Sequence, residues 1–137
     1  MTEQELYKAR ELRNRILAMA RHVESLRISA SNLVPVLDGL PHARQSESRV
    51  EKIALKVLES EKELASLREE FDTVAAQLAE KIKNAPLSSQ EREILILRYV
   101  ACERFRDISF QTNYSDAHVF HLHRTAVDKI LSDKDNS

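Results

Sequence analysis

Apolar residues recur with a seven-residue period over the first third of the chain. One set of these positions runs from Ala9 to Ala30, and a second set, offset by three positions, runs from Leu12 to Leu33. Two apolar positions in every seven residues form one stripe along an α-helix, which is typical of a coiled-coil seam. The pattern predicts one long helix over about residues 2–33.

The same period returns in the second third of the chain. One set of apolar positions runs from Val50 to Leu78, and its companion set is interrupted at Ser60. Dense glutamate and lysine occupy the positions between the two sets. The pattern predicts a second long helix, which ends near Asn84.

A connector separates the two predicted helices. Residues 34–46 hold two of the three prolines and the only glycine, and these residue types interrupt helices and permit bends. Ser48 and Glu51 have the spacing of a capping box, so we expect the second helix to begin near Ser46 or Ser48.

Two long helices joined by a bend are expected to fold back on each other. We therefore predict a coiled-coil-like antiparallel hairpin for residues 1–85. Because two helices alone bury only a thin seam, a stripe of this length also indicates further packing. We expect a homo-oligomer, most simply a dimer formed through the hairpin.

Three shorter helices are predicted in residues 86–137. Pro86 ends the long helix, and Ser88 with Glu91 forms a second capping box. The helices are expected over about residues 88–100, 104–112 and 115–132. In the second of these, the predicted inward positions are Phe105 and Ile108, with Phe110 as a further candidate.

A short turn joins the last two predicted helices. Asn113 stands at its tight point, and asparagine tolerates positive φ better than most residues. Ser115 follows as the expected N-cap of the last helix. Two helices joined by such a turn describe a helix-turn-helix. The expected fold class is therefore all-α, a long antiparallel helical hairpin followed by a three-helix helix-turn-helix domain.

Composition agrees with a helical chain and limits the range of functions. Of 137 residues, 31% are charged and the net charge is −1. Residues 86–137 carry seven Lys and Arg against eight Asp and Glu, so the helix-turn-helix is not a strongly basic module. The chain has no apolar run of the roughly 20 residues that span a bilayer and starts without the apolar core of a signal peptide. We expect a cytoplasmic protein without membrane contact.

No residue pattern typical of catalysis stands out. A single glycine cannot build a phosphate-binding loop, and Cys102, the only cysteine, is expected to be a buried apolar residue. His118, His121 and His123 are closely spaced, but only the first two share a helix face, and a zinc site needs three or four convergent ligands. We predict that the protein is not an enzyme and carries no metal and no cofactor.

The helix-turn-helix sequence resembles region four of bacterial sigma factors. The matching pieces include Leu97-Arg98-Tyr99, the cap Ser115 and the helix end Ala126-Val127-Asp128-Lys129-Ile130. The resemblance covers about a third of the chain. It implies a three-helix domain that binds promoter DNA through its last helix and contacts RNA polymerase.

The whole chain is also similar to a family of small phage and prophage proteins. The family combines a helical hairpin, a loop phrase of the form "PHA/PHG" and a sigma region-four-like domain. Here the loop phrase is Leu40-Pro41-His42-Ala43, and Ser48-Arg49-Val50-Glu51-Lys52 follows it. The resemblance implies a role in late transcription regulation.

The sigma-factor pattern assigns candidate DNA contacts residue by residue. Base-facing positions fall on Asp116, Ala117, His118, Phe120 and His121. The residues expected to hold phosphate are Arg98, Arg104, Arg106, Ser115, Arg124 and Lys129. None of the five base-facing residues is arginine, the side chain that most often contacts guanine.

Two functions follow from this sequence. The first is a phage-type transcription regulator that binds DNA, RNA polymerase or both through the helix-turn-helix. The second is a protein-interaction module that binds a polymerase subunit or another regulator without touching DNA. The near-neutral charge of residues 86–137 favours the second, whereas the turn, the cap and the helix spacing favour the first.

Overall fold

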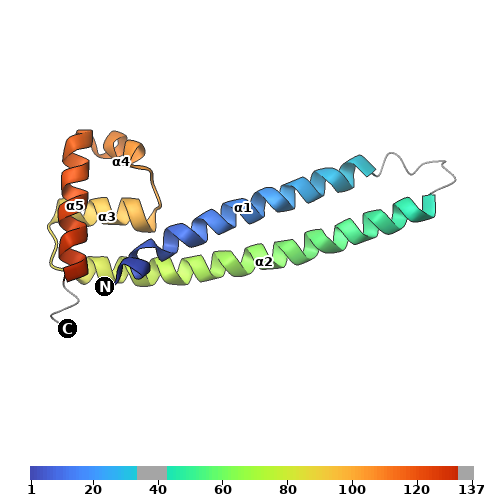
Figure 1. The fold of residues 1–137 in the computed structure, drawn as a ribbon, viewed down its shortest axis with the longest axis horizontal. Helices are drawn as coiled ribbons and strands as arrows, with labels where there is room; N and C mark the ends of the chain where they lie inside the picture. Colours follow the sequence, from blue (N-terminus) through green and yellow to red (C-terminus); the bar gives the residue numbers. More distant parts are fainter. Residues whose placement is uncertain (34–42, 133–137) are drawn as a thin grey trace. The chain divides into compact units, whose positions relative to one another are not determined.

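The computed structural model describes residues 1–33 and 43–132, and every regular element in these ranges is helical. The elements in chain order are α1 (Glu3–Leu33), α2 (Ala43–Asn84), α3 (Ser89–Leu95), the π-helical turn η2 (Ile96–Val100), α4 (Phe105–Thr112) and α5 (Asp116–Ser132). Helices α1 and α2 form a long antiparallel hairpin, and three shorter packed helices follow (Figure 1). The predicted fold class is confirmed.

The chain divides into two compact units, and both boundaries cut through the long helices. One unit, here called the arm, comprises Asn14–Glu69. The other, here called the terminal unit, joins Met1–Arg13 to the chain from Glu70 onward. The domain boundary predicted from the sequence lies instead between residues 85 and 86, where the long helices give way to the short ones.

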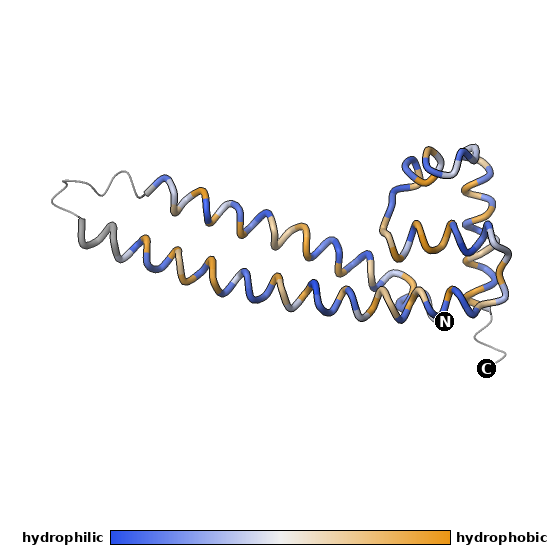
Figure 2. Tube along the Cα trace, turned by 180° about the vertical axis from the view of Figure 1, so that it is seen from behind, coloured by the Kyte–Doolittle hydropathy of each residue, from blue (hydrophilic) through white to orange (hydrophobic). Residues whose placement is uncertain are grey.

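The arm is a two-helix seam built from the heptad stripes of the sequence. Val23 of α1 and Leu64 of α2 are its buried hydrophobic residues. The other stripe positions described in the arm, such as Ile16 and Val57, are half-buried. Figure 2 shows hydrophobic and hydrophilic positions alternating along both long helices. A seam of this kind leaves most of the surface of each helix exposed to solvent.

The start of α2 differs from the prediction. The helix begins at Ala43, so Ser48 lies inside it and the capping box expected at Ser48 and Glu51 is wrong. Alanine, arginine and glutamine are good helix formers, and they extend the helix toward its N-terminus past the serine. Of the connector predicted at residues 34–46, residues 34–42 lie outside the described structure.

The terminal unit has a core to which the start of α1 and the end of α2 both contribute. Its largest cluster of buried residues comes from α1, α2, α3, η2 and α5 and the linker before α3: Leu6, Ala9, Leu78, Ile82, Ala85, Leu87, Leu95, Tyr99, Ala126 and Ile130. A second cluster joins α3, α4 and α5 through Ile94, Ile108, Val119 and Leu122. The three short helices therefore fold on the base of the hairpin as well as on one another.

Two capping boxes start helices of the terminal unit. At α3, the Glu91 N–H donates to Ser88 Oγ at 3.2 Å, and the Ser88 N–H donates to Glu91 Oε1 at 3.0 Å, as predicted. At α1, Thr2 and Glu5 make the same reciprocal pair, at 3.2 and 3.4 Å. Each box satisfies backbone donors that have no partner inside the helix. No described helix is long and apolar enough to cross a membrane.

Candidate nucleic-acid interface

The turn between α4 and α5 has the geometry of a helix-turn-helix. Asn113 is left-handed at φ 60° and ψ 19°, as its place in the sequence predicts. The Tyr114 N–H donates to Thr112 Oγ1 at 3.3 Å. The His118 N–H donates to Ser115 Oγ at 3.1 Å, which confirms Ser115 as the N-cap of α5. The turn therefore fixes where α5 starts relative to α4.

Helix α5 divides cleanly into an inner and an outer face. The inner face is buried and consists of Val119, Leu122, Ala126 and Ile130. Of the five predicted base-facing residues, Asp116, Ala117, Phe120 and His121 are exposed. The fifth, His118, is half-buried, and its ring lies edge-on to Tyr114 with centroids 5.2 Å apart.

Two phenylalanines stand out on the surface of the helix-turn-helix. Phe120 on α5 is 52% exposed and lies 4.9 Å from Phe105, centroid to centroid. Phe110 on α4 is 85% exposed, so the expectation that it is an inward candidate is wrong. Ile108 occupies the inward position of α4, and a residue two places further along a helix points about 200° away from it.

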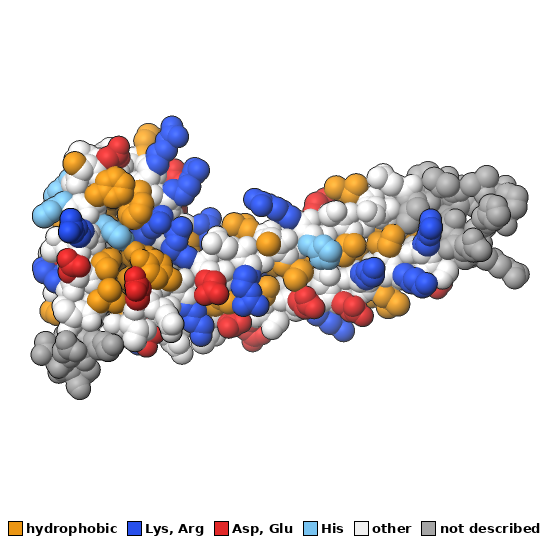
Figure 3. All heavy atoms as spheres, viewed as in Figure 1, with side chains coloured by type: hydrophobic (Ala, Val, Ile, Leu, Met, Phe, Trp, Pro, Cys, Tyr) orange, Lys and Arg blue, Asp and Glu red, His pale blue; other side chains and the backbone are white. Residues whose placement is uncertain are grey.

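Five of the six predicted phosphate-binding residues are exposed: Arg104, Arg106, Ser115, Arg124 and Lys129. Arg104 donates through Nε to Asp107 Oδ2 at 3.1 Å, an exposed pair at the start of α4. Arg106 and Ser115 line one open depression over α4 and the turn, together with Phe110, Asn113 and Tyr114. Figure 3 shows Lys and Arg side chains gathered around α4 on this face.

Arg98 has partners inside the terminal unit. Its guanidinium carbon lies 4.0 Å from the centroid of the Phe105 ring, and Nη1 donates to the Glu103 carbonyl at 3.1 Å. Desolvation, followed by the nearby charge of Arg10, lowers the pKa of the Arg98 side chain. These contacts join η2 to α4. The Arg98 side chain itself is half-buried.

Lys129 ties α5 to α3. Its Nζ lies 2.8 Å from Glu91 Oε1, and that carboxylate is buried. Burial alone would raise the pKa of the Glu91 carboxyl, but hydrogen bonds from Lys129 and Ser88 outweigh it and hold the pKa below its usual value. Glu91 and Lys129 thus hold α5 against α3.

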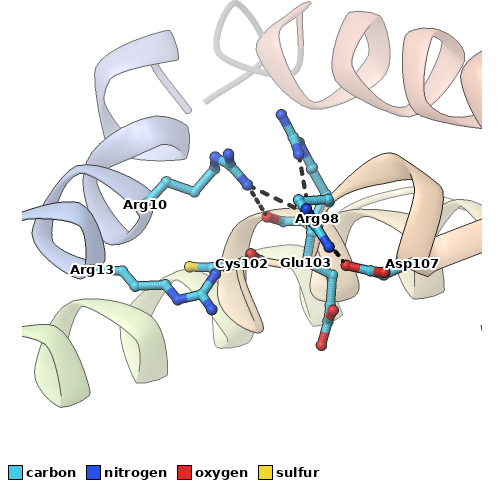
Figure 4. Close-up of polar contacts among 7 residues, drawn as sticks. Arg10, Arg13, Arg98, Cys102, Glu103 and Asp107 are labelled. Atoms are coloured by element: carbon cyan, nitrogen blue, oxygen red, sulfur yellow. Dashed lines mark hydrogen bonds and ion pairs between the residues drawn. The ribbon is translucent and has the colours of Figure 1, made fainter. Parts of the chain in front are cut away.

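Two arginines of α1 hold the loop between η2 and α4. Arg10 donates through Nη1 to the carbonyls of Arg98 and Glu103 at 3.4 and 3.5 Å, and Arg13 donates to the carbonyl of Cys102 (Figure 4). Cys102 is buried and left-handed at φ 60°. Cationic donors complement carbonyls at the C-terminal end of a helix. Arg10 and Arg13 carry no signal in the sequence that distinguishes them from other surface arginines.

His123 points away from the outer face of α5. Its Nε2 lies 2.6 Å from Tyr99 Oη, and its ring stacks on Tyr99 and meets Phe105 edge-on. Burial, followed by the charge of Arg98, lowers the pKa of His123, so its neutral form is favoured. Among the described residues, no three His, Cys, Asp or Glu side chains converge as a metal site.

Comparisons with protein-family models, with curated proteins and with solved structures give no match to this chain.

Proposed function

We propose that the protein is a transcription regulator of the phage type, which binds double-stranded DNA by placing α5 in the major groove. The observation that carries the proposal is the division of α5: its apolar face is packed on α3 and α4, and Asp116, Ala117, Phe120 and His121 on its other face are exposed. A capped helix presented in this way by a preceding turn is the recognition element of helix-turn-helix proteins.

Phosphate contacts would come from both sides of α5. Arg106 and Ser115 flank its N-terminus, where the helix dipole attracts anions, and Arg104 lies at the start of α4. Arg124 lies about one turn along α5 from Phe120 and His121. The resemblance to sigma region four extends the proposal to RNA polymerase as a second partner.

Salt dependence of binding tests the proposal directly. Duplexes selected from a random pool are bound to the full chain, and affinity is measured by fluorescence anisotropy at several salt concentrations. Three arginine–phosphate contacts correspond to a slope of about −2.7 and an affinity loss of about 40-fold between 50 and 200 mM salt. Absence of binding at the lowest salt would overturn the proposal.

Matched variants separate phosphate contact from general charge. Arg106→Ala should weaken binding to every duplex alike and reduce the salt slope by about 1. Arg21→Ala, the same change at an exposed position on the arm, should leave the affinity and the salt slope unaltered. His121→Ala should reduce the difference in binding affinity between selected and scrambled duplexes, because one base contact contributes about 1–3 kcal/mol. Equal losses of affinity for Arg106→Ala and Arg21→Ala would contradict α5 as the DNA-binding element.

A second candidate function, protein binding without DNA contact, is favoured by the exposed Phe110 and Phe120 rings. Under this function, Phe110→Ser should weaken capture of RNA polymerase, and none of the DNA measurements above should show specific binding. Aromatic residues are enriched where proteins bind one another.

A further inference from the structure

The two broad sides of the arm are distinguishable. In the heptad frame that puts Val23 and Leu64 at position a, Arg27 and Glu61 both fall at position e. Arg27 Nη2 and Glu61 Oε1 form an ion pair, so the e positions of α1 and α2 lie on the same side of the hairpin. The g positions of both helices therefore lie on the opposite side.

These two sides differ in chemistry. Positions e and b together, here called the e/b face, include the apolar residues Leu17, Ala20, Ala54, Leu58 and Ala65. Leu17 and Leu58 are 43% and 55% exposed. Positions g and c on the opposite side include the polar and charged residues Arg15, His22, Lys52, Lys56, Glu59 and Glu63. A helix surface with a second apolar stripe beside its first is suited to packing on more than one neighbour.

We propose that the e/b face packs against the same face of a second copy of the chain, so that two arms form a four-helix bundle. The arm by itself buries only Val23 and Leu64 among its described hydrophobic residues, and a second hairpin would cover the half-exposed stripe. Alanine at Ala20, Ala54 and Ala65 allows helices to approach closely.

The size and charge of the e/b face match a self-contact. Twenty helical residues span ~30 Å and two helices ~20 Å, so the face covers ~600 Å² and a dimer would bury ~1,200 Å², within the range of stable interfaces. Its charged residues have both signs: Glu24, Arg27, Glu51, Glu61 and Arg68. A face of mixed sign does not repel its own copy, whereas a basic or acidic face would favour a partner of opposite charge.

The test uses four exposed apolar residues of the arm as two matched pairs. Leu58→Glu and Leu17→Glu place a charge in the proposed contact, whereas Leu55→Glu and Ile28→Glu change position f, which faces directly away from the α1–α2 seam. Leu55 and Ile28 are 59% and 52% exposed, so the pairs match in burial as well as in substitution. Circular dichroism of each variant verifies that the helices remain.

Sedimentation of the full chain over a wide concentration range gives the result. We expect the wild type to be a dimer, the two b-position variants to raise its dissociation constant by roughly a hundredfold, and the two f-position variants to leave it unchanged. A monomeric wild type overturns the proposal, as does dissociation by Leu55→Glu or Ile28→Glu with retention of the dimer in Leu58→Glu. Because no DNA is present, this outcome is independent of whether α5 binds DNA.

Discussion

The terminal unit and the arm use the same two helices but differ in how those helices are stabilised. Of 19 buried hydrophobic residues among those described, 17 lie in the terminal unit, and the arm contributes only Val23 and Leu64. In the terminal unit, α1 and α2 each meet several neighbours, whereas in the arm each meets only the other. A continuous heptad stripe therefore predicts which residues pair but not how completely they are buried, because burial depends on what covers the pair.

The largest predicted effect contrasts two isoleucines of α2. Ile82 is fully buried in the terminal unit and Ile53 is half-buried in the arm. Ile82→Ala should lower the free energy of unfolding by about 4 kcal/mol, and Ile53→Ala by about 1 kcal/mol, because the cost follows the buried volume that is lost. Urea unfolding followed by circular dichroism measures both. Similar losses for the two variants would show that the arm is covered as well as the terminal unit.

A smaller effect is expected at the buried carboxylate of the terminal unit. Glu91→Gln keeps the shape of the capping box but removes the charge that Lys129 pairs with. We expect a loss of about 2 kcal/mol near neutral pH, which is typical of a hydrogen bond to a charged group. Glu61→Gln removes the exposed Arg27 pair of the arm and serves as the control, with a loss below about 1 kcal/mol.

The pH dependence of Glu91 provides the independent check. Folding lowers the pKa of Glu91 below its usual 4.5. The contribution of Glu91 to stability is therefore present above pH 4.5 and is lost as the pH falls through the pKa of the folded state. The difference in stability between wild type and Glu91→Gln should therefore shrink in acid. A difference that stays constant down to low pH would mean that the charge of Glu91 does not stabilise the fold.

The smallest predicted effect concerns His123. Its pKa is lowered from 6.5 in the folded state, so the unfolded chain takes up a proton first as the pH falls, and stability decreases below about pH 6.5. His123→Phe retains an aromatic ring between Tyr99 and Phe105 but cannot titrate. Thermal unfolding across this pH range should show a shallower decline for the variant. A decline for His123→Phe as steep as that of the wild type would show that His123 does not cause the pH dependence.

Some features of the candidate site were predictable from the sequence and others were not. Asn113 and Ser115 were predictable because a left-handed turn and an N-cap each require particular residue types at a fixed place. The exposure of Phe110 was not, because an aromatic residue favours burial only where another element lies opposite it. The loop contacts of Arg10 and Arg13 also escape prediction, since some 90 residues of sequence separate donor from acceptor.

The sequence alone determined the helices, their pairing partners and the turn, because periodicity, prolines and caps act over a few residues. The base-facing positions assigned from the sigma-factor pattern include Asp116, Ala117, Phe120 and His121, which are exposed on α5. Only the tertiary structure decided that Met1–Arg13 belongs to the same compact unit as α5 and that Arg98 and Lys129 have partners within the fold. Such contacts depend on which distant segments pack together, and the residue types involved are equally common on a solvated surface.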